Sequence, residues 1–314
     1  MKHKVCCKWE RRATSKSLGQ PISMARSTSG PVVALFGASG YVGTRVCRTL
    51  LDAGVPVTAT SRSGTARSSA DSISNRARWV TSTLPDSPPP RSELQGASAA
   101  VSTVGLLGAG ASAERVTGDA NVSAAEAASD AGIPRFILVS AHMYRGPPAA
   151  ALPGYFRGKQ KAEHAVMRLF PHSGICLRPG FVYGSRRVSN RVSLPLHLIG
   201  QPLNSLLASS GATRARSSLP DAVGSLLEPP VSVNTLASAI AVSALHPDVR
   251  GGVASYDRIV ELSGMQLPAF ESTSASAGSS SSQSYVDRQK QEQEGSGVEA
   301  YQHHASESAD KQSP

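Results

Sequence analysis

The sequence predicts an α/β fold in which helices cover both faces of a doubly wound parallel sheet. Two observations predict it. Short apolar runs typical of buried strands alternate with segments of helical periodicity, and the first run passes through glycines directly into the first helix. Strands that alternate with helices in this way pair in parallel through right-handed crossovers.

The expected elements follow one another between residues 31 and 245. Apolar runs predict strands over 31–36, 55–60, 78–80, 99–104, 135–139 and 174–178. Apolar residues spaced three and four apart predict helices over 41–53, 112–131, 155–169 and 231–245. Gly54 and Gly132 follow the first two helices directly, as glycine does where a helix ends.

The pattern breaks after residue 184. Leucines interrupted by Pro195, Gly200 and Pro202 predict a small C-terminal substrate lobe over about residues 185–250. Residues 266–314 are rich in Ser and Gln and show no apolar periodicity, which predicts a disordered tail. The folded unit is therefore expected to span residues 31–265.

The first 30 residues hold seven Lys or Arg and one acid, Glu10, without the apolar stretch of a secretory signal. This composition predicts an organellar transit peptide. Two alternatives stay open: a disordered basic arm, or an upstream extension with translation starting at Met24 rather than Met1.

Composition excludes several function classes. The four cysteines lack metal-ligand spacing, so we expect no metal site. No apolar run is long enough to span a bilayer. The net charge of +10 is scattered over the predicted domain, which disfavours nucleic-acid binding.

The predicted junction of first strand and first helix holds Gly37, Gly40 and Gly43, three residues apart. This spacing suits a tight turn, a close approach of backbone to a pyrophosphate, and close packing of helix on strand. Free amides at the helix start then bind phosphate, and Ser39, Tyr41 and Val42 lie in the same turn. We therefore predict a dinucleotide site here rather than a purely structural turn.

The end of the second predicted strand carries Ser61-Arg62-Ser63, with no acid between Asp52 and Asp71. An NAD site would place Asp or Glu there, whereas Arg62 can pair with a 2′-phosphate. The cofactor is therefore predicted to be NADP(H), with NAD disfavoured. The alternative is that Arg62 is a solvated loop residue.

Ser140 ends the strand FILVS, and Tyr155 and Lys159 lie four apart on the following helix. A neighbouring ammonium favours a phenolate, so we expect Lys159 to lower the pKa of Tyr155 and make it an acid–base group. Ser140, at the strand's carboxyl end, could bind the substrate oxygen. The alternative is an aromatic ring packed beside a surface lysine.

The segments GASGYVG, AAVSTVG, RFILVSA, GYFRGK and LRPGFVYG occur in the order typical of the atypical or extended short-chain dehydrogenases/reductases. Residues 31–250 resemble this family, which has an NAD(P)-binding Rossmann fold. The Tyr-x-Arg-x-Lys form is most similar to a mitochondrial branch. That branch includes the nucleotide-binding accessory subunit of complex I and a dehydrogenase-like protein of coenzyme Q synthesis, although plastid relatives look similar.

The resemblance implies roles for single residues. Gly37, Gly40 and Gly43 would lie at the pyrophosphate and Arg62 at the adenosine phosphate. Thr103, Val104 and Gly105 would follow the nucleotide, and Ser140, Tyr155 and Lys159 would face the nicotinamide, with Lys159 also holding its ribose. The sequence departs from the family in lacking an acid at Thr81-Ser-Thr83 and in carrying Asn234 where relatives have Asp.

The implied function is an NADP(H)-dependent oxidoreductase acting on a carbonyl or hydroxyl group, in mitochondrial quinone metabolism. The alternatives are a non-catalytic NADPH-binding assembly or accessory subunit of a mitochondrial or chloroplast complex, and a redox sensor. The expected partner is a small, quinone-like substrate. The Leu/Pro-rich stretch 191–207 leaves peripheral membrane or complex association open.

Overall fold

The computed structural model describes residues 30–67, 72–144, 147–187, 193–195, 207 and 227–268. Seven parallel strands form its main sheet in the order β11-β6-β5-β4-β1-β2-β3. The strands are β1 (Val33–Phe36), β2 (Val57–Ser61), β3 (Arg78–Thr81), β4 (Ala99–Ser102), β5 (Phe136–Val139), β6 (Gly174–Leu177) and β11 (Gly252–Ala254). The predicted doubly wound α/β fold is confirmed.

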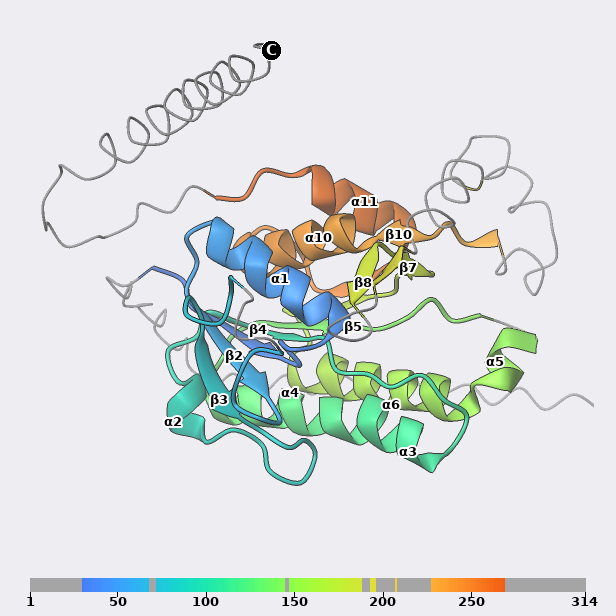
Figure 1. Cartoon of the computed structure of the whole chain (residues 1–314), viewed down its shortest axis with the longest axis horizontal. Helices are drawn as coiled ribbons and strands as arrows, with labels where there is room; N and C mark the ends of the chain where they lie inside the picture. Colours follow the sequence, from blue (N-terminus) through green and yellow to red (C-terminus); the bar gives the residue numbers. More distant parts are fainter. Residues whose placement is uncertain are drawn as a thin grey trace, which may run out of the picture.

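Helices cover both faces of this sheet (Figure 1). One face carries α1 (Tyr41–Asp52), α10 (Val233–Leu245) and α11 (Tyr256–Gly264). The other carries α2 (Arg91–Leu94), α3 (Ala111–Glu114), α4 (Ala120–Asp130) and α6 (Pro153–Leu169). The short helix α5 (Pro147–Ala151) precedes α6.

The central strands consist of unbroken apolar residues because both of their faces are buried. All four residues of β1, VALF, are fully buried, because each face of the strand packs against a helical layer. Val33 and Leu35 belong to the cluster beneath α1 and α10, whereas Ala34 and Phe36 belong to the cluster beneath α4 and α6. Alternate side chains therefore fill two separate cores.

The strand order places a topological switch point between β1 and β4. The chain runs outward from β1 through β2 to β3, then returns to the other side of β1 to form β4. Ligands of open parallel sheets bind outside the carboxyl ends of the strands at such a point. Residues that follow β1, β2, β4 and β5 are thus brought to one edge of the sheet.

The predicted helix over 112–131 is corrected by the structure. Instead of one regular helix, α3 continues through a π-helical turn, Arg115–Asp119, into α4. The turn lies where Gly118 meets α6, because a Cβ atom at Gly118 would come within 3.0 Å of the Cα of Gly158. Two neighbouring glycines therefore let this segment and α6 approach closely.

The C-terminal part of the predicted lobe is also corrected. Helix α10 belongs to the helical layer of the sheet, since its Leu236 and Ile240 are fully buried in the main core. Strand β11 then pairs with β6, and α11 packs against α10. Neither β11 nor α11 was predicted, because a three-residue strand with one exposed valine gives little apolar pattern.

The rest of the predicted lobe lies mostly outside the described residues. Four short strands are described around it: β7 (Val182–Tyr183) pairs with β10 (Val231–Ser232), and β8 (Ser185–Arg187) pairs with β9 (Ser193–Pro195). The predicted transit peptide over 1–30 and tail over 266–314 fall outside the description, except for Gly30 and residues 266–268.

Candidate functional site: a glycine turn and a Ser–Tyr–Lys group

The turn between β1 and α1 has the shape that the glycine spacing predicted. Gly37 adopts a positive φ of 76°, and the amide of Gly40 donates to its carbonyl oxygen at 2.9 Å. A Cβ atom at Gly43 would lie 2.2 Å from the oxygen of Gly37, so helix and turn approach as only glycine permits. Gly40 is the N-cap residue of α1. Because glycine has no side chain, the cap makes no side-chain hydrogen bond to the amides at the helix start.

Thr103 joins this turn to the end of β4. Its hydroxyl lies 3.1 Å from the carbonyl oxygens of both Phe36 and Gly37 and donates to this pair. The next residue, Val104, lies against Gly37, since a Cβ atom there would come within 3.1 Å of the valine side chain. Thr103 and Val104 thus adjoin the glycine turn; that they follow the nucleotide stays a prediction.

Two buried polar residues, neither of them predicted from the sequence, hold the loop after β4. The side-chain amide of Asn121 donates to the carbonyls of Val104 at 3.1 Å and Thr117 at 2.7 Å, while its oxygen accepts from Ser102 at 2.5 Å. The Thr117 hydroxyl contacts both the amide and the carbonyl of Leu106. Their polar character inside an otherwise alanine-rich helix is the signal that could have revealed them.

Arg62 occupies the exposed tip of a short turn after β2. The Ser61 hydroxyl accepts from the amide of Thr65 at 3.1 Å and contacts its carbonyl at 2.8 Å, closing the turn. No acid directly follows β3, since Ser82 and Thr83 come after Thr81, the last residue of the strand. A Cβ atom at Gly64 would come within 2.3 Å of the Thr81 hydroxyl. Arg62 therefore follows β2 at the carboxyl edge of the sheet, the edge at which the glycine turn follows β1.

Ser140 follows β5 at the carboxyl edge of the sheet. Its amide donates to the carbonyl of Leu177 at 2.7 Å, which anchors the backbone. Ser140 is only 3% exposed, yet its hydroxyl has no hydrogen-bond partner among the residues that the structure describes. Because a buried unpaired hydroxyl costs free energy, this atom marks a place where a ligand oxygen can bind.

The side chain of Lys159 reaches the residue that precedes Ser140. Its buried ammonium donates to the carbonyl of Val139 at 2.6 Å. The nitrogen also lies 3.5 Å from the position that a Cβ atom of Gly105 would take, which places it beneath the loop after β4. Burial lowers the pKa of Lys159 to about 8, against the opposing effect of Glu163.

The expected effect of Lys159 on Tyr155 is corrected by the structure. The lysine nitrogen lies 5.6 Å from the centre of the tyrosine ring. Burial nevertheless raises the pKa of Tyr155 to about 12, and the neighbouring Tyr144 adds to the effect. Removal from water outweighs the nearby cation, so Tyr155 is a neutral phenol at neutral pH.

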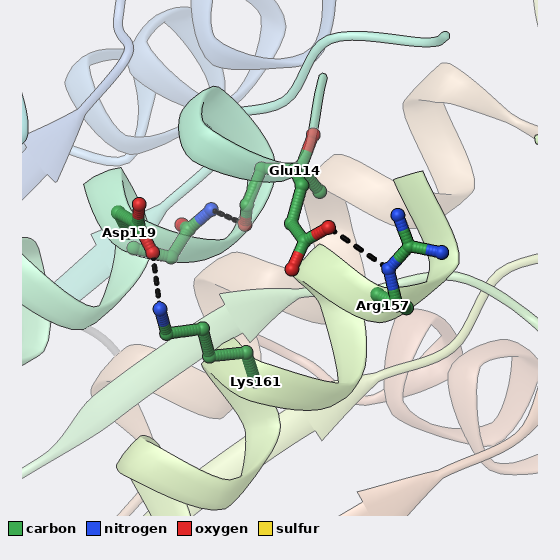
Figure 2. A network of polar contacts seen from close by, with 6 residues as sticks. Glu114, Asp119, Arg157 and Lys161 are labelled. Atoms are coloured by element: carbon green, nitrogen blue, oxygen red, sulfur yellow. Dashed lines mark hydrogen bonds and ion pairs between the residues drawn. The ribbon is translucent and has the colours of Figure 1, made fainter. Parts of the chain in front are cut away.

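Ion pairs link α6, the helix that carries both residues, to α3 and the π-helical turn. Figure 2 shows Arg157 beside Glu114 and Lys161 beside Asp119, with Nε–Oε2 and Nζ–Oδ1 distances of 2.9 and 2.5 Å. These two basic residues face α3 and the π-helical turn on an exposed side, while Lys159 points inward. Each exposed pair contributes about 1 kcal/mol or less.

A second polar cluster, His142, Tyr144 and Glu228, flanks the site and was also missed. The His142 Nδ1 lies 3.7 Å from the Glu228 carboxylate, and the His142 ring packs edge-on against Tyr144. Gly180 permits this, because a Cβ atom there would fall within 3.4 Å of both the Tyr144 hydroxyl and the Glu228 side chain. Burial and Glu228 raise the pKa of Tyr144.

The predicted site residues thus meet at one edge of the sheet. Gly37, Ser39, Gly40, Tyr41, Val42 and Gly43 form the turn and the start of α1, and Thr103, Val104 and Gly105 form the adjoining loop. Arg62 lies at the end of β2, away from Ser140 and Lys159. A cradle that a Cβ atom would fill and an unpaired buried hydroxyl fit an extended nucleotide lying across the switch point.

Two other kinds of site find no support in the described part of the chain. It holds no group of three His, Cys, Asp or Glu side chains arranged to bind a metal ion. Among its helices, none combines the length and the apolar character needed to cross a membrane.

Comparison with known proteins agrees with this geometry. A family model described as NAD(P)H-binding matches residues 37–192. An uncharacterised chloroplastic protein of Arabidopsis thaliana, At1g32220, is 37% identical over 261 residues, covering 82% of this chain and 85% of that protein. The mitochondrial protein fmp-52 of Neurospora crassa is 31% identical over 172 residues, covering 51% of this chain and 69% of that protein.

Two solved structures that partly match this chain are complexes with NAD. MoeE5 in complex with UDP-glucuronic acid and NAD is 20% identical with a TM-score of 0.49, over 74% of this chain and 81% of that one. The Bordetella bronchiseptica enzyme WbmH in complex with NAD⁺ is 16% identical with a TM-score of 0.48, over 72% and 75%.

Proposed function

Because the chain belongs to the NAD(P)H-binding family of Rossmann-fold proteins related to the short-chain dehydrogenases/reductases, we propose that it is an NADP(H)-dependent oxidoreductase acting on a carbonyl or hydroxyl group. Two features carry the proposal: the buried Ser140 hydroxyl has no partner within the described part of the chain, and the buried Lys159 ammonium donates to the carbonyl of Val139, the residue before Ser140. These groups lie at the sheet edge where the glycine turn would hold the cofactor.

The cofactor's residues follow from the turn and its neighbours. Gly37, Gly40 and Gly43 would hold the pyrophosphate at the start of α1, and Thr103 to Gly105 would follow the nucleotide. Lys159, beneath the loop at Gly105, would bind the nicotinamide ribose hydroxyls. When bound, NADPH supplies the hydride, while the protein supplies orientation and electrostatics.

The protonation state of Tyr155 favours carbonyl reduction. A phenol whose pKa is about 12 keeps its proton at neutral pH and can donate it to a substrate oxygen. The Ser140 hydroxyl would donate a second hydrogen bond to the same oxygen, which stabilises the negative charge that develops there. Tyr155 is then the general acid, and Ser140 orients the substrate.

Exposed apolar residues support an apolar substrate such as a quinone. Leu106 and Leu107, which are 44% and 66% exposed, stand in the loop after β4. The amide of Tyr155 donates to Gly108 of the same loop at 3.1 Å, so both leucines adjoin the active-site helix. Phe181, which is 47% exposed, comes directly after Gly180 in the segment that follows β6.

Calorimetric titration of the full chain with NADPH and NADH tests the cofactor. We expect tighter NADPH binding, and we expect Arg62→Glu to weaken it by about 10- to 100-fold, as for a lost charge-assisted hydrogen bond. NADH affinity should not fall in this variant. Arg67→Glu, a change of the same charge in a neighbouring exposed residue, is the matched control. Equal affinity for both cofactors in the unaltered chain would overturn the NADP(H) assignment.

Turnover is tested with NADPH and a panel of quinones and their carbonyl precursors. We expect Tyr155→Phe to abolish oxidation of NADPH while its affinity stays within about twofold, because the phenol is needed only for proton transfer. The non-catalytic accessory-subunit alternative would be favoured by two results together. The unaltered chain would bind NADPH without turning over any substrate of the panel, and Tyr155→Phe would keep full function in cells. Failure to bind either cofactor would remove both functions.

We also propose that residues 1–30 direct the protein to an organelle. The relatives are described as chloroplastic and mitochondrial, which supports an organellar location. The basic, acid-poor composition of residues 1–30 supports a transit peptide. A fluorescent fusion of residues 1–30, imaged with mitochondrial and plastid markers, distinguishes mitochondrion from chloroplast. Diffuse fluorescence would reject the targeting role.

A further inference from the structure

Lys159 is a buried lysine at the sheet edge, a position where a charged side chain is unusual. Lys159 is 3% exposed, and within the described part of the chain its nitrogen donates to one carbonyl oxygen, that of Val139. A buried amine tends to lose its proton, since burial disfavours the charged form. An uncharged amine would hold cofactor hydroxyls less strongly, because charge-assisted hydrogen bonds are about twice as strong as neutral ones.

Glu163 lies one helical turn after Lys159 on α6, on the same buried side of that helix. Its side chain is only 7% exposed. Both of its carboxylate oxygens are engaged by Arg178, which follows β6: Nε lies 2.9 Å from Oε1, and Nη2 lies 2.5 Å from Oε2. A paired, planar contact of this kind fixes the carboxylate in position.

The groups acting on Lys159 differ in charge at neutral pH. Burial raises the pKa of the Cys176 thiol on β6 to about 12, and that of Tyr155 is about 12, so both stay neutral. The pKa of Lys159 is lowered by burial, and Glu163 opposes this effect. Among the described groups that act on Lys159, Glu163 is thus the negatively charged one, and Arg178 is the cation that faces it.

We propose that Glu163, fixed by Arg178, is a positioning residue whose carboxylate keeps the buried Lys159 amine protonated and able to hold the cofactor ribose. The inference about charge rests on the chain's own residues, and its consequence for the ribose rests on the proposed function. Arg178 acts one step further away, by preventing Glu163 from turning toward solvent.

The charge of Lys159 can be measured directly in the full chain without cofactor. With ¹³C-labelled lysine, the Cε resonance is followed against pH by NMR and assigned by its loss in Lys159→Met. We expect a midpoint near pH 8 in the unaltered protein. In Glu163→Gln the midpoint should move to lower pH by about one unit, since an adjacent negative charge favours the ammonium form.

Three further variants separate electrostatics from misfolding. Glu163→Gln leaves Arg178 without its partner, so Glu163→Gln/Arg178→Met removes both charges and should show the same lowered midpoint. Glu163→Asp keeps the charge and should restore most of the original midpoint. Glu114→Gln, which removes an exposed carboxylate paired with Arg157, should leave the midpoint unchanged. An unshifted midpoint in folded Glu163→Gln would overturn the inference.

Cofactor affinity supplies the second measurement. NADPH affinity of Glu163→Gln should fall by about threefold or more between pH 6 and pH 8, and more than in the unaltered chain, because its Lys159 loses the proton earlier. A lowered Lys159 midpoint with no change in NADPH affinity would uphold the role of Glu163 in charging the amine. It would, however, reject the proposed contact of Lys159 with the ribose, so the two failures are distinguishable.

Discussion

The side-chain amide of Asn121 donates to the carbonyl oxygen of Val104 at 3.1 Å, linking the start of α4 to the loop that would follow the nucleotide. Asn121 is fully buried, and its other contacts reach Ser102 and Thr117. The loop after β4, beside the switch point between β1 and β4, is thus held by a buried residue on α4.

Asn121→Ala should therefore weaken cofactor binding and stability together. Three hydrogen bonds are lost, and two of the groups left behind, the Ser102 hydroxyl and the Thr117 carbonyl, lie in the interior. We expect a loss of about 1–3 kcal/mol in the free energy of unfolding, measured by urea denaturation. Glu126→Gln, at an exposed position of the same helix, should change little. Unchanged stability of Asn121→Ala would show that this network is replaceable by water.

Gly43→Ala tests the close packing of α1 on the glycine turn. The new methyl group would lie 2.2 Å from the oxygen of Gly37 and 2.8 Å from the Thr103 hydroxyl, so the turn must move. We expect a loss of NADPH affinity of at least tenfold, measured by calorimetry, with a lowered melting temperature. Gly264→Ala, where a Cβ atom meets nothing within 4 Å, is the control and should be neutral. Native affinity in Gly43→Ala would contradict the proposed phosphate cradle.

Arg135 ties β5 to the end of α10. Its guanidinium donates to the carbonyls of Ser243, Val249 and Pro247 at 2.9, 3.0 and 3.0 Å. Because these carbonyls would lose a charged donor, Arg135→Met should cost about 2–3 kcal/mol of unfolding free energy, read from denaturant curves. Arg250→Met removes an exposed arginine nearby and should cost little. Equal curves for both variants would mean that the α10 end is held by packing alone.

Part of this architecture could be predicted from local patterns. The glycine spacing at 37, 40 and 43 and the fully apolar strand β1 are contiguous in sequence, and both appear where expected. The pairing of Asn121 with Val104 and of Glu163 with Arg178 could not be predicted, since each depends on how distant segments approach in the folded chain.

The predicted lowering of the Tyr155 pKa was wrong for a related reason. Spacing alone revealed a lysine one turn away, but it could not reveal how far the phenol is withdrawn from water. Burial is a property of the whole fold and here outweighs a single neighbouring charge. Likewise, α10 looked like part of a lobe because the strand after it, β11, is too short to show an apolar pattern.

The ionisation of Tyr155 provides a prediction about pH. The difference in tyrosinate absorbance near 295 nm between the unaltered chain and Tyr155→Phe should titrate with a midpoint of about 12. In the unfolded chain the same difference should move to about pH 10, the ordinary value for a phenol. Because the folded pKa exceeds the unfolded one, burial of neutral Tyr155 contributes stability fully below about pH 10, and this contribution is lost as the pH rises from about 10 to 12. A native midpoint at or below 10 would restore the expectation that Lys159 lowers the pKa of Tyr155, and would favour Tyr155 as a base in alcohol oxidation.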